Sequence, residues 1–272
     1  MAAPAALEEA RTDTASAPLA LRIAAIGRSL IGADYAPDPE GEGLPPDPDP
    51  TLRFDVFDCI TFVEVVLAYA LGRDDLEVAD IRYRLRYGDG PVQYENRNHL
   101  IELQWLPDAV RNGLLSESTH MLTDRTVTVP LAISLNTWNA WKGRAAFAMT
   151  DSQLPIGAAE IRVIRAGEAL AQIANIPPGS VLLPVRSPRN WRPVLTFHAG
   201  FVVADPRGPR LLHATKLGDG AVRDDSLAWY LEHLTTYPWP VEGVAIYTPV
   251  ERDDGSTANP GPTRDGADSL TE

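Results

Sequence analysis

The sequence predicts an α+β fold, in which helices come first along the chain and an antiparallel sheet follows. Two observations predict this class. Between residues 18 and 115 apolar residues recur at helical spacing, whereas after residue 180 runs rich in Val, Leu and Phe are separated by turn signals. No internal repeat is visible, so we expect a single domain over residues 17–250, with a disordered tail at 1–16 and a disordered acidic tail at 251–272.

The individual elements follow from the same patterns. The predicted helices are residues 18–30, 58–71, 75–115 in pieces, 160–173 and 225–234. The predicted strands are residues 180–185, 194–204, 210–216 and 243–249, with a hairpin turn at 205–209. Residues 34–50 are too rich in Pro and acidic residues for regular structure, so we expect a long surface loop that carries Tyr35 at its start.

The charge balance excludes some classes of partner. The 272 residues include 24 Lys and Arg against 37 Asp and Glu, a formal charge of −13. Phosphate groups of nucleic acids and anionic membrane surfaces require a clustered surplus of Lys and Arg, which we do not find in this acidic chain. No run approaches the roughly 18 consecutive apolar residues of a membrane span, so we expect no membrane insertion.

Cys59 is the first candidate for chemistry. It falls in the first turn of the helix predicted at 58–71, behind Asp58 in a capping position. A helix start lowers the pKa of a thiol and offers free amides to an oxyanion. The alternative is that Cys59 is a small buried apolar residue. As the single cysteine of the chain it cannot form an internal disulfide.

Two histidines on adjacent predicted strands favour the chemical interpretation. In LTFHAGFVV (195–203), strand alternation places His198 on the face opposite Phe197, beside Gly200, which leaves open space. A register that pairs His213 with Gly200 would bring the two imidazoles together, and a slip of one residue would separate them. A thiol, a base and a group that orients the base form the logic of cysteine catalysis.

These segments resemble a known family. FDCITFVE (57–64), FHAGFVV (197–203) and LLHATK (211–216), together with LIGADY (30–35) and YENRNH (94–99), are similar to the DUF1460 family of N-acetylmuramoyl-L-alanine amidase-like proteins. That family is a branch of the NlpC/P60 papain-like cysteine hydrolases. The resemblance runs from about residue 19 to 247 and implies a papain-like fold, with the nucleophile at a helix start packed on the sheet.

The resemblance also implies residue roles. Cys59 would be the nucleophile, His198 the general base and His213 the residue that orients it. Tyr35 matches a tyrosine that lies near the thiolate in the family, although loop sequence follows it here in place of the usual Gly pair. Asp58 would cap the helix or touch substrate.

Three further residues are candidates for substrate binding. Arg97 and His99 could bind substrate carboxylates, or Arg97 could hold a loop to an acidic neighbour. Trp191 could offer a flat platform to a sugar ring, or could simply pack.

The implied activity is cleavage of an amide bond in peptidoglycan fragments (muropeptides), between N-acetylmuramic acid or its 1,6-anhydro form and L-Ala. The alternatives are an endopeptidase that cuts inside the stem peptide, and a silent peptidoglycan-binding module. A zinc site made by Cys59, His198 and His213 is a further alternative, but the chain lacks HExxH, and we expect neither metal nor cofactor. We expect a monomer. The family suggests a periplasmic or exported protein, although no signal peptide is visible.

Overall fold

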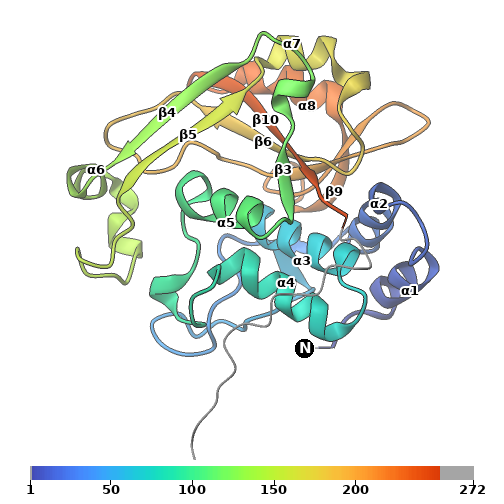
Figure 1. Ribbon diagram of the computed structural model, residues 1–272, viewed down its shortest axis with the longest axis horizontal. Helices are drawn as coiled ribbons and strands as arrows, with labels where there is room; N and C mark the ends of the chain where they lie inside the picture. The colour runs from blue at the N-terminus through green and yellow to red at the C-terminus, as the bar shows by residue number, and fades with distance from the viewer. Residues whose placement is uncertain (1, 252–272) are drawn as a thin grey trace, which may run out of the picture.

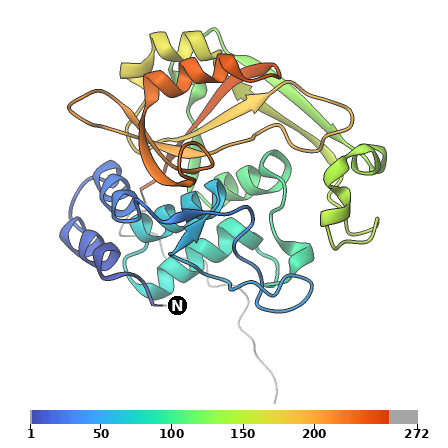
Figure 2. The same cartoon turned by 180° about the vertical axis from the view of Figure 1, so that it is seen from behind.

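An eight-stranded sheet separates two layers of helices in this computed structural model, which describes residues 2–251. Helices from the first half of the chain cover one face of the sheet, and two short helices from the second half cover the other (Figures 1 and 2). A mixed α+β fold is therefore confirmed. A separate two-stranded ribbon extends to one side (Figure 1).

The helices lie mainly in the first half of the chain. Their bounds are α1 Ala5–Asp13, α2 Leu19–Ser29, α3 Cys59–Leu71, α4 Asp75–Tyr87, α5 Leu106–Arg111, α6 Leu135–Ala140, α7 Ala166–Ala171 and α8 Leu227–His233. A π-helical segment, Ile101–Trp105, precedes α5. Single 3-10 turns lie at Tyr94–Asn96, Thr119–Met121, Lys142–Ala146, Ile173–Asn175 and Leu234–Thr236.

The strands form the sheet in the order β2-β1-β9-β8-β7-β6-β10-β3. Their bounds are β1 Asp34–Tyr35, β2 Val56–Phe57, β3 Leu115–Glu117, β6 Val181–Arg186, β7 Gly200–Val203, β8 Arg210–Thr215, β9 Ala221–Ser226 and β10 Val241–Pro249. Neighbours pair antiparallel except β1 and β2, which are parallel. β4 (Val127–Ile133) and β5 (Gly157–Val163) form the separate ribbon.

Strand alternation assigns each side chain of β8 to one of two cores. Leu212 and Ala214 pack into the larger core, which contains the apolar residues of α2 and α3. Leu211 packs into the smaller core under α7 and α8. His213 shares the parity of Leu211 and lies against Tyr230 of α8, with ring centroids 5.5 Å apart. The sheet thus presents His213 on the side of α8.

The prediction of a disordered tail at residues 1–16 is wrong for most of that segment. Residues 5–13 form α1, and Leu7 is fully buried in the larger core. Arg11 reaches Asp75 at 2.8 Å and lies over the ring of Tyr69. These tertiary contacts supply the burial that the composition of the segment did not reveal. The folded region therefore begins before residue 17, while the tail predicted at 251–272 lies, except for Glu251, outside the described residues.

Two other predicted elements require correction. The sequence predicts one helix over residues 160–173, but 157–163 form β5 because they pair with β4, and the α-helix spans only 166–171. The strand expected over 194–204 is regular only from Gly200 to Val203. The segment before it is irregular, so Phe197 departs from simple alternation and packs against the smaller core. The hairpin between β7 and β8 is confirmed.

Candidate active site

Helix α3 begins at Cys59 because Asp58 caps it. Oδ1 of Asp58 accepts hydrogen bonds from the amides of Ile60 at 2.9 Å and Thr61 at 2.7 Å. The Thr61 hydroxyl accepts in return from the Asp58 amide at 3.0 Å, which completes a capping box. The capping role of Asp58 is therefore confirmed, and the cap fixes the position of the thiol at the first residue of a largely buried helix.

The register of β7 and β8 brings the two predicted histidines together. Phe201 pairs with Leu212, and the same register carried one step further sets Gly200 opposite His213. Nε2 of His198 then lies 2.6 Å from Nδ1 of His213. His198 stands two residues before β7 and is half-buried, whereas His213 is fully buried. This is the register that the sequence interpretation requires.

A carboxylate behind His213 extends the pair. Nε2 of His213 lies 3.0 Å from Oδ2 of Asp225, and Arg223 holds the other oxygen of that carboxylate at 2.9 Å. The sequence interpretation did not identify Asp225 as a site residue, because it placed Asp225 at the cap of a helix over 225–234. In the structure Ser226 caps α8, and Asp225 is the penultimate residue of β9, paired with Leu211 of β8. The alternation in AVRDDS was the available signal, since it sets Arg223 and Asp225 on one face.

The contacts that link Asp225, His213 and His198 determine which ring nitrogen of each histidine carries a proton. Burial opposes ionisation of Asp225, but hydrogen bonds to His213 and Arg223 hold the pKa of its carboxyl below the usual value. A carboxylate only accepts, so Nε2 of a neutral His213 donates to Asp225 and Nδ1 accepts. Nε2 of His198 must then donate to His213. The free lone pair of His198 is thereby left on Nδ1, the nitrogen that can act as a base.

The environment keeps both the thiol and the imidazole uncharged. Burial, followed by repulsion from the Asp58 carboxylate, raises the pKa of Cys59 to about 12. The amide of Ala199, the residue after His198, donates to the sulfur and partly opposes this shift. Burial, assisted by His213, lowers the pKa of His198 well below its usual value. At neutral pH the site therefore rests as a neutral thiol and a neutral imidazole.

Two tyrosines border these groups. Burial and then the proximity of Cys59 raise the pKa of Tyr35, so its hydroxyl stays protonated and able to donate. Tyr230 of α8 is fully buried, and its ring lies 5.8 Å from that of His198 and 5.5 Å from that of His213. It packs against both imidazoles, and the sequence interpretation did not identify it. An aromatic residue inside an apolar helix carries no signal of its own.

Comparison with known proteins places this chain in a family. The model of the N-acetylmuramoyl-L-alanine amidase-like family matches residues 25–237. The chain belongs to that family. By that membership it is an amidase-like enzyme, from a family of peptidoglycan-acting amidases. Among curated proteins the comparison found no match.

Solved structures share the fold of this amidase-like chain. A Legionella pneumophila protein of the DUF1460 family superposes with a TM-score of 0.78 at 21% identity, over 90% of this chain and 93% of that one. An N-acetylmuramoyl-L-alanine amidase from Bacteroides uniformis superposes with a TM-score of 0.67 at 19% identity, over 89% of this chain and all of that one. At this level of identity the likeness shows the fold.

In this amidase-like chain the Arg97 side chain forms ion pairs with the loop after β1. Its buried guanidinium pairs with Asp38 at 3.0 Å, Glu42 at 2.7 Å and Asp47 at 2.6 Å, which ties the loop after β1 to the segment before α5. The structure therefore favours the loop-holding role over substrate binding. Nε2 of His99 lies 2.7 Å from the backbone carbonyl oxygen of Tyr94.

Trp191 differs from Arg97 and His99 because it is exposed. The residue is 39% exposed, and the guanidinium carbon of Arg192 lies 4.6 Å from its ring centroid. An exposed tryptophan seven residues before His198 is available to a ligand.

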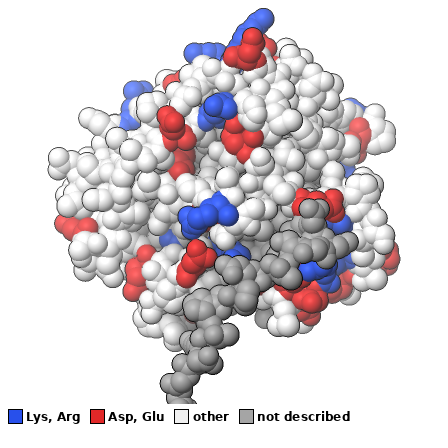
Figure 3. All heavy atoms as spheres, viewed as in Figure 1, with Lys and Arg blue, Asp and Glu red and all other residues white. Residues whose placement is uncertain are grey.

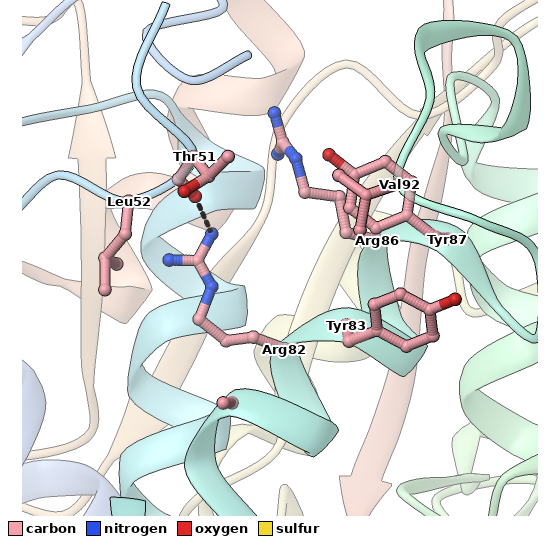
Figure 4. Close-up of a pocket in the computed structure, with 8 residues that line it drawn as sticks. Thr51, Leu52, Arg82, Tyr83, Arg86, Tyr87 and Val92 are labelled. Atoms are coloured by element: carbon pink, nitrogen blue, oxygen red, sulfur yellow. Dashed lines mark hydrogen bonds between the residues drawn. The ribbon is translucent and has the colours of Figure 1, made fainter. Parts of the chain in front are cut away.

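A cavity of about 250 Å³, whose lining does not include Cys59, lies along α4 (Figure 4). Arg82 and Arg86 line it, and Arg82 donates to the carbonyl oxygen of Thr51 at 3.3 Å. Arg82 also pairs with the buried Glu40 at 2.5 Å, while Arg86 pairs with Glu64 of α3 at 3.3 Å. These opposite charges compensate one another, so the cavity belongs to the structural support of α3.

The described residues set further limits on the site. Within residues 2–251 no three His, Cys, Asp or Glu side chains are grouped to hold a metal ion, and both ring nitrogens of His213 are engaged by His198 and Asp225. No helix in that range is long and apolar enough to cross a membrane. On the face seen in Figure 3, acidic and basic side chains are scattered among uncharged ones.

Proposed function

We propose that this chain is a cysteine amidase of the papain-like NlpC/P60 type that cleaves the bond between N-acetylmuramic acid, or its 1,6-anhydro form, and L-Ala. The observation that carries the proposal is the row formed by His198, His213 and Asp225, which ends at an imidazole next to the amide that contacts the Cys59 sulfur. The family and the name of the Bacteroides uniformis structure supply the bond.

The first step follows from the neutral resting state. As the Cys59 sulfur attacks the amide carbon, Nδ1 of His198 takes the thiol proton, because Nε2 already donates to His213. His213 and Asp225 stabilise the imidazolium that forms, as the carboxylate does in other triads. Proton transfer during attack spares the site a buried thiolate that its surroundings disfavour.

The tetrahedral intermediate needs hydrogen-bond donors. Asp58 already engages the amides of Ile60 and Thr61, so we assign the oxyanion to the Cys59 amide and the Tyr35 hydroxyl. His198 then gives its proton to the amino group of L-Ala, and the carbon–nitrogen bond breaks to leave a thioester. A water that His198 deprotonates hydrolyses the thioester, which releases the muramic acid carboxylate and restores the thiol.

The test is a digestion followed by mass spectrometry. Wild-type protein incubated with a 1,6-anhydro-muropeptide should release a stem peptide that begins with L-Ala. Alkylation and Cys59→Ala should both abolish release, since Cys59 is the single cysteine of the chain. His198→Ala should do the same, while His120→Ala, which removes an exposed histidine paired with Glu117, should retain activity.

Other products would replace the proposal. A cut inside the stem peptide would make the protein an endopeptidase, and binding without cleavage would make it a silent module. Release that survives Cys59→Ala and stops with a chelator would overturn the thiol mechanism in favour of a metal.

A further inference from the structure

A short basic segment precedes the catalytic histidine. Residues 186–192 (RSPRNWR) contain Arg186, Arg189 and Arg192, and within the described part of the chain none of the three forms an ion pair. This is unexpected in a chain in which carboxylates outnumber basic residues by 37 to 24. Three unpaired guanidinium groups within seven residues create a local positive potential on an acidic protein.

Aromatic rings, and no ion-paired carboxylate, contact the guanidinium of Arg186. Its guanidinium carbon lies 4.9 Å from the ring centroid of Phe197 and 5.6 Å from that of Trp239. Its Nε is buried without a hydrogen-bond partner in the structure. Burial, and then repulsion from Arg192, lower the pKa of Arg186 to about 10, so it remains a cation at neutral pH. The charge of Glu102 opposes this shift, but no carboxylate forms an ion pair with the partly desolvated Arg186, and an anionic ligand would supply one.

An exposed tryptophan lies against each of two of these cations. Trp191 is 39% exposed beneath Arg192, and Trp239 is 38% exposed beside Arg186. Trp239 and Tyr237 also line an open hollow of about 490 Å³. Trp and Arg are the residue types that contribute most at binding surfaces, because they combine large contact area with directed polar groups. We call Arg186, Arg192, Trp191 and Trp239 the arginine–tryptophan surface.

The charges near the thiol indicate which part of a substrate would lie toward the arginine–tryptophan surface. Phe197, which carries Arg186 on its ring, directly precedes His198. Asp58 adjoins Cys59, and Asp38, which pairs with Arg97 at 3.0 Å, is near enough to Asp58 that the two carboxylates repel each other. An anionic part of a substrate is therefore favoured toward the arginines and disfavoured toward the loop after β1. Lys216, whose ammonium lies 5.6 Å from the ring centroid of Tyr35, is the competing cation.

We propose that the arginine–tryptophan surface binds a carboxylate of the stem peptide, on the leaving-amine side of Cys59. The inference rests on the proposed function, since a stem peptide ends in a free carboxylate whereas an anhydro sugar is uncharged. The planar guanidinium of Arg186 would pair with that carboxylate, and the indole rings would cover the peptide backbone. The surface thus selects muropeptides that retain an acidic stem.

The experiment compares one muropeptide in two forms, with free carboxylates and with the same groups converted to carboxamides. We expect wild-type protein to cleave the acidic form with a kcat/KM about tenfold higher, carried mainly by KM. Arg186→Met and Arg192→Met should each reduce this preference to about twofold or less, and Arg186→Lys should restore part of it. Arg125→Met, which removes an exposed arginine paired with Glu168, should keep the full preference.

Calorimetry on Cys59→Ala separates this inference from the proposed function. If wild type releases no stem peptide from either form, the proposed function fails, while tighter binding of the acidic form by Cys59→Ala still supports the surface. Equal binding of both forms, or a preference that survives in folded Arg186→Met and Arg192→Met proteins, overturns the inference. Loss of the preference in Lys216→Met alone would assign the carboxylate to Lys216 and would also overturn it.

Discussion

Gly200 stands against the side chain of His213, and this contact sets the distance between the two catalytic candidates. A Cβ added at Gly200 would lie 2.8 Å from the Cβ of His213 and 3.0 Å from the backbone oxygen of Leu212. Real Cβ atoms do not approach so closely, so only glycine fits here. The absence of a side chain lets His198 reach Nδ1 of His213 at 2.6 Å.

We therefore expect Gly200→Ala to lower activity. Overpacking should destabilise the fold by about 1–3 kcal/mol and displace His213 from His198, with kcat falling more than KM changes. Gly167→Ala is the matched control, because nothing lies within 4 Å of a Cβ at Gly167 in α7. Denaturant unfolding and steady-state kinetics on both variants test this. An unchanged kcat in Gly200→Ala would show that the histidine contact does not matter for turnover.

Asp225→Asn should remove the group that fixes the protons. An amide can donate to Nε2 of His213, which would leave His198 protonated on the nitrogen that must act as the base. We expect kcat to fall on the order of 10² to 10⁴, as in triads whose carboxylate is replaced by an amide, with little change in KM.

The matched control for Asp225→Asn is Asp224→Asn. This substitution, at the residue next to Asp225, breaks the ion pair that Asp224 forms with Arg210 at 2.5 Å. If both variants lose the same activity, the effect is one of strand stability, and Asp225 has no special role.

Asp58 combines two effects that a pair of variants can separate. Its side chain caps α3, and its charge adds to burial in raising the pKa of Cys59. Asp58→Ser keeps a capping oxygen but removes the charge, so the thiol pKa should fall and alkylation at pH 7 to 8 should be faster than in wild type. Asp58→Ala should also lose about 0.5–2 kcal/mol of stability. Iodoacetamide kinetics with thermal unfolding distinguish the two, and equal alkylation of Asp58→Ser and wild type would contradict the charge effect.

The sequence predicted the parts of the site that depend on local chemistry. The start of α3 at Cys59 follows from a capping residue and an apolar run, both of which are local. The meeting of His198 and His213 was predicted as a condition on register, because alternation fixes the face of a strand but not its alignment with a neighbour. The structure meets that condition.

The remainder depended on distant contacts. Asp225 has the form of a helix cap in the sequence, and only the pairing of β9 with β8 turns it toward His213. Leu7 is buried in the larger core through tertiary packing, which composition does not reveal, so composition alone indicated a tail. Residues 157–163 form a strand because β4 offers them a partner, which overrides their local preference for a helix.

His99 predicts how stability depends on pH. Burial lowers the pKa of its imidazole to about 4, although its hydrogen bond with the Tyr94 carbonyl opposes the shift. The unfolded chain protonates His99 near pH 6.5, whereas the folded protein does not until about pH 4. The contribution of neutral His99 to the free energy of unfolding is thus complete above pH 6.5. It is lost, by about 3 kcal/mol, as the pH falls from 6.5 toward 4.

His99→Gln should remove this part of the pH dependence of stability, so the free energies of unfolding of variant and wild type should converge on acidification. His120→Gln, at an exposed histidine, controls for the loss of an imidazole. Parallel curves for His99→Gln and wild type between pH 7 and pH 4 would show that His99 titrates alike in the folded and unfolded chain.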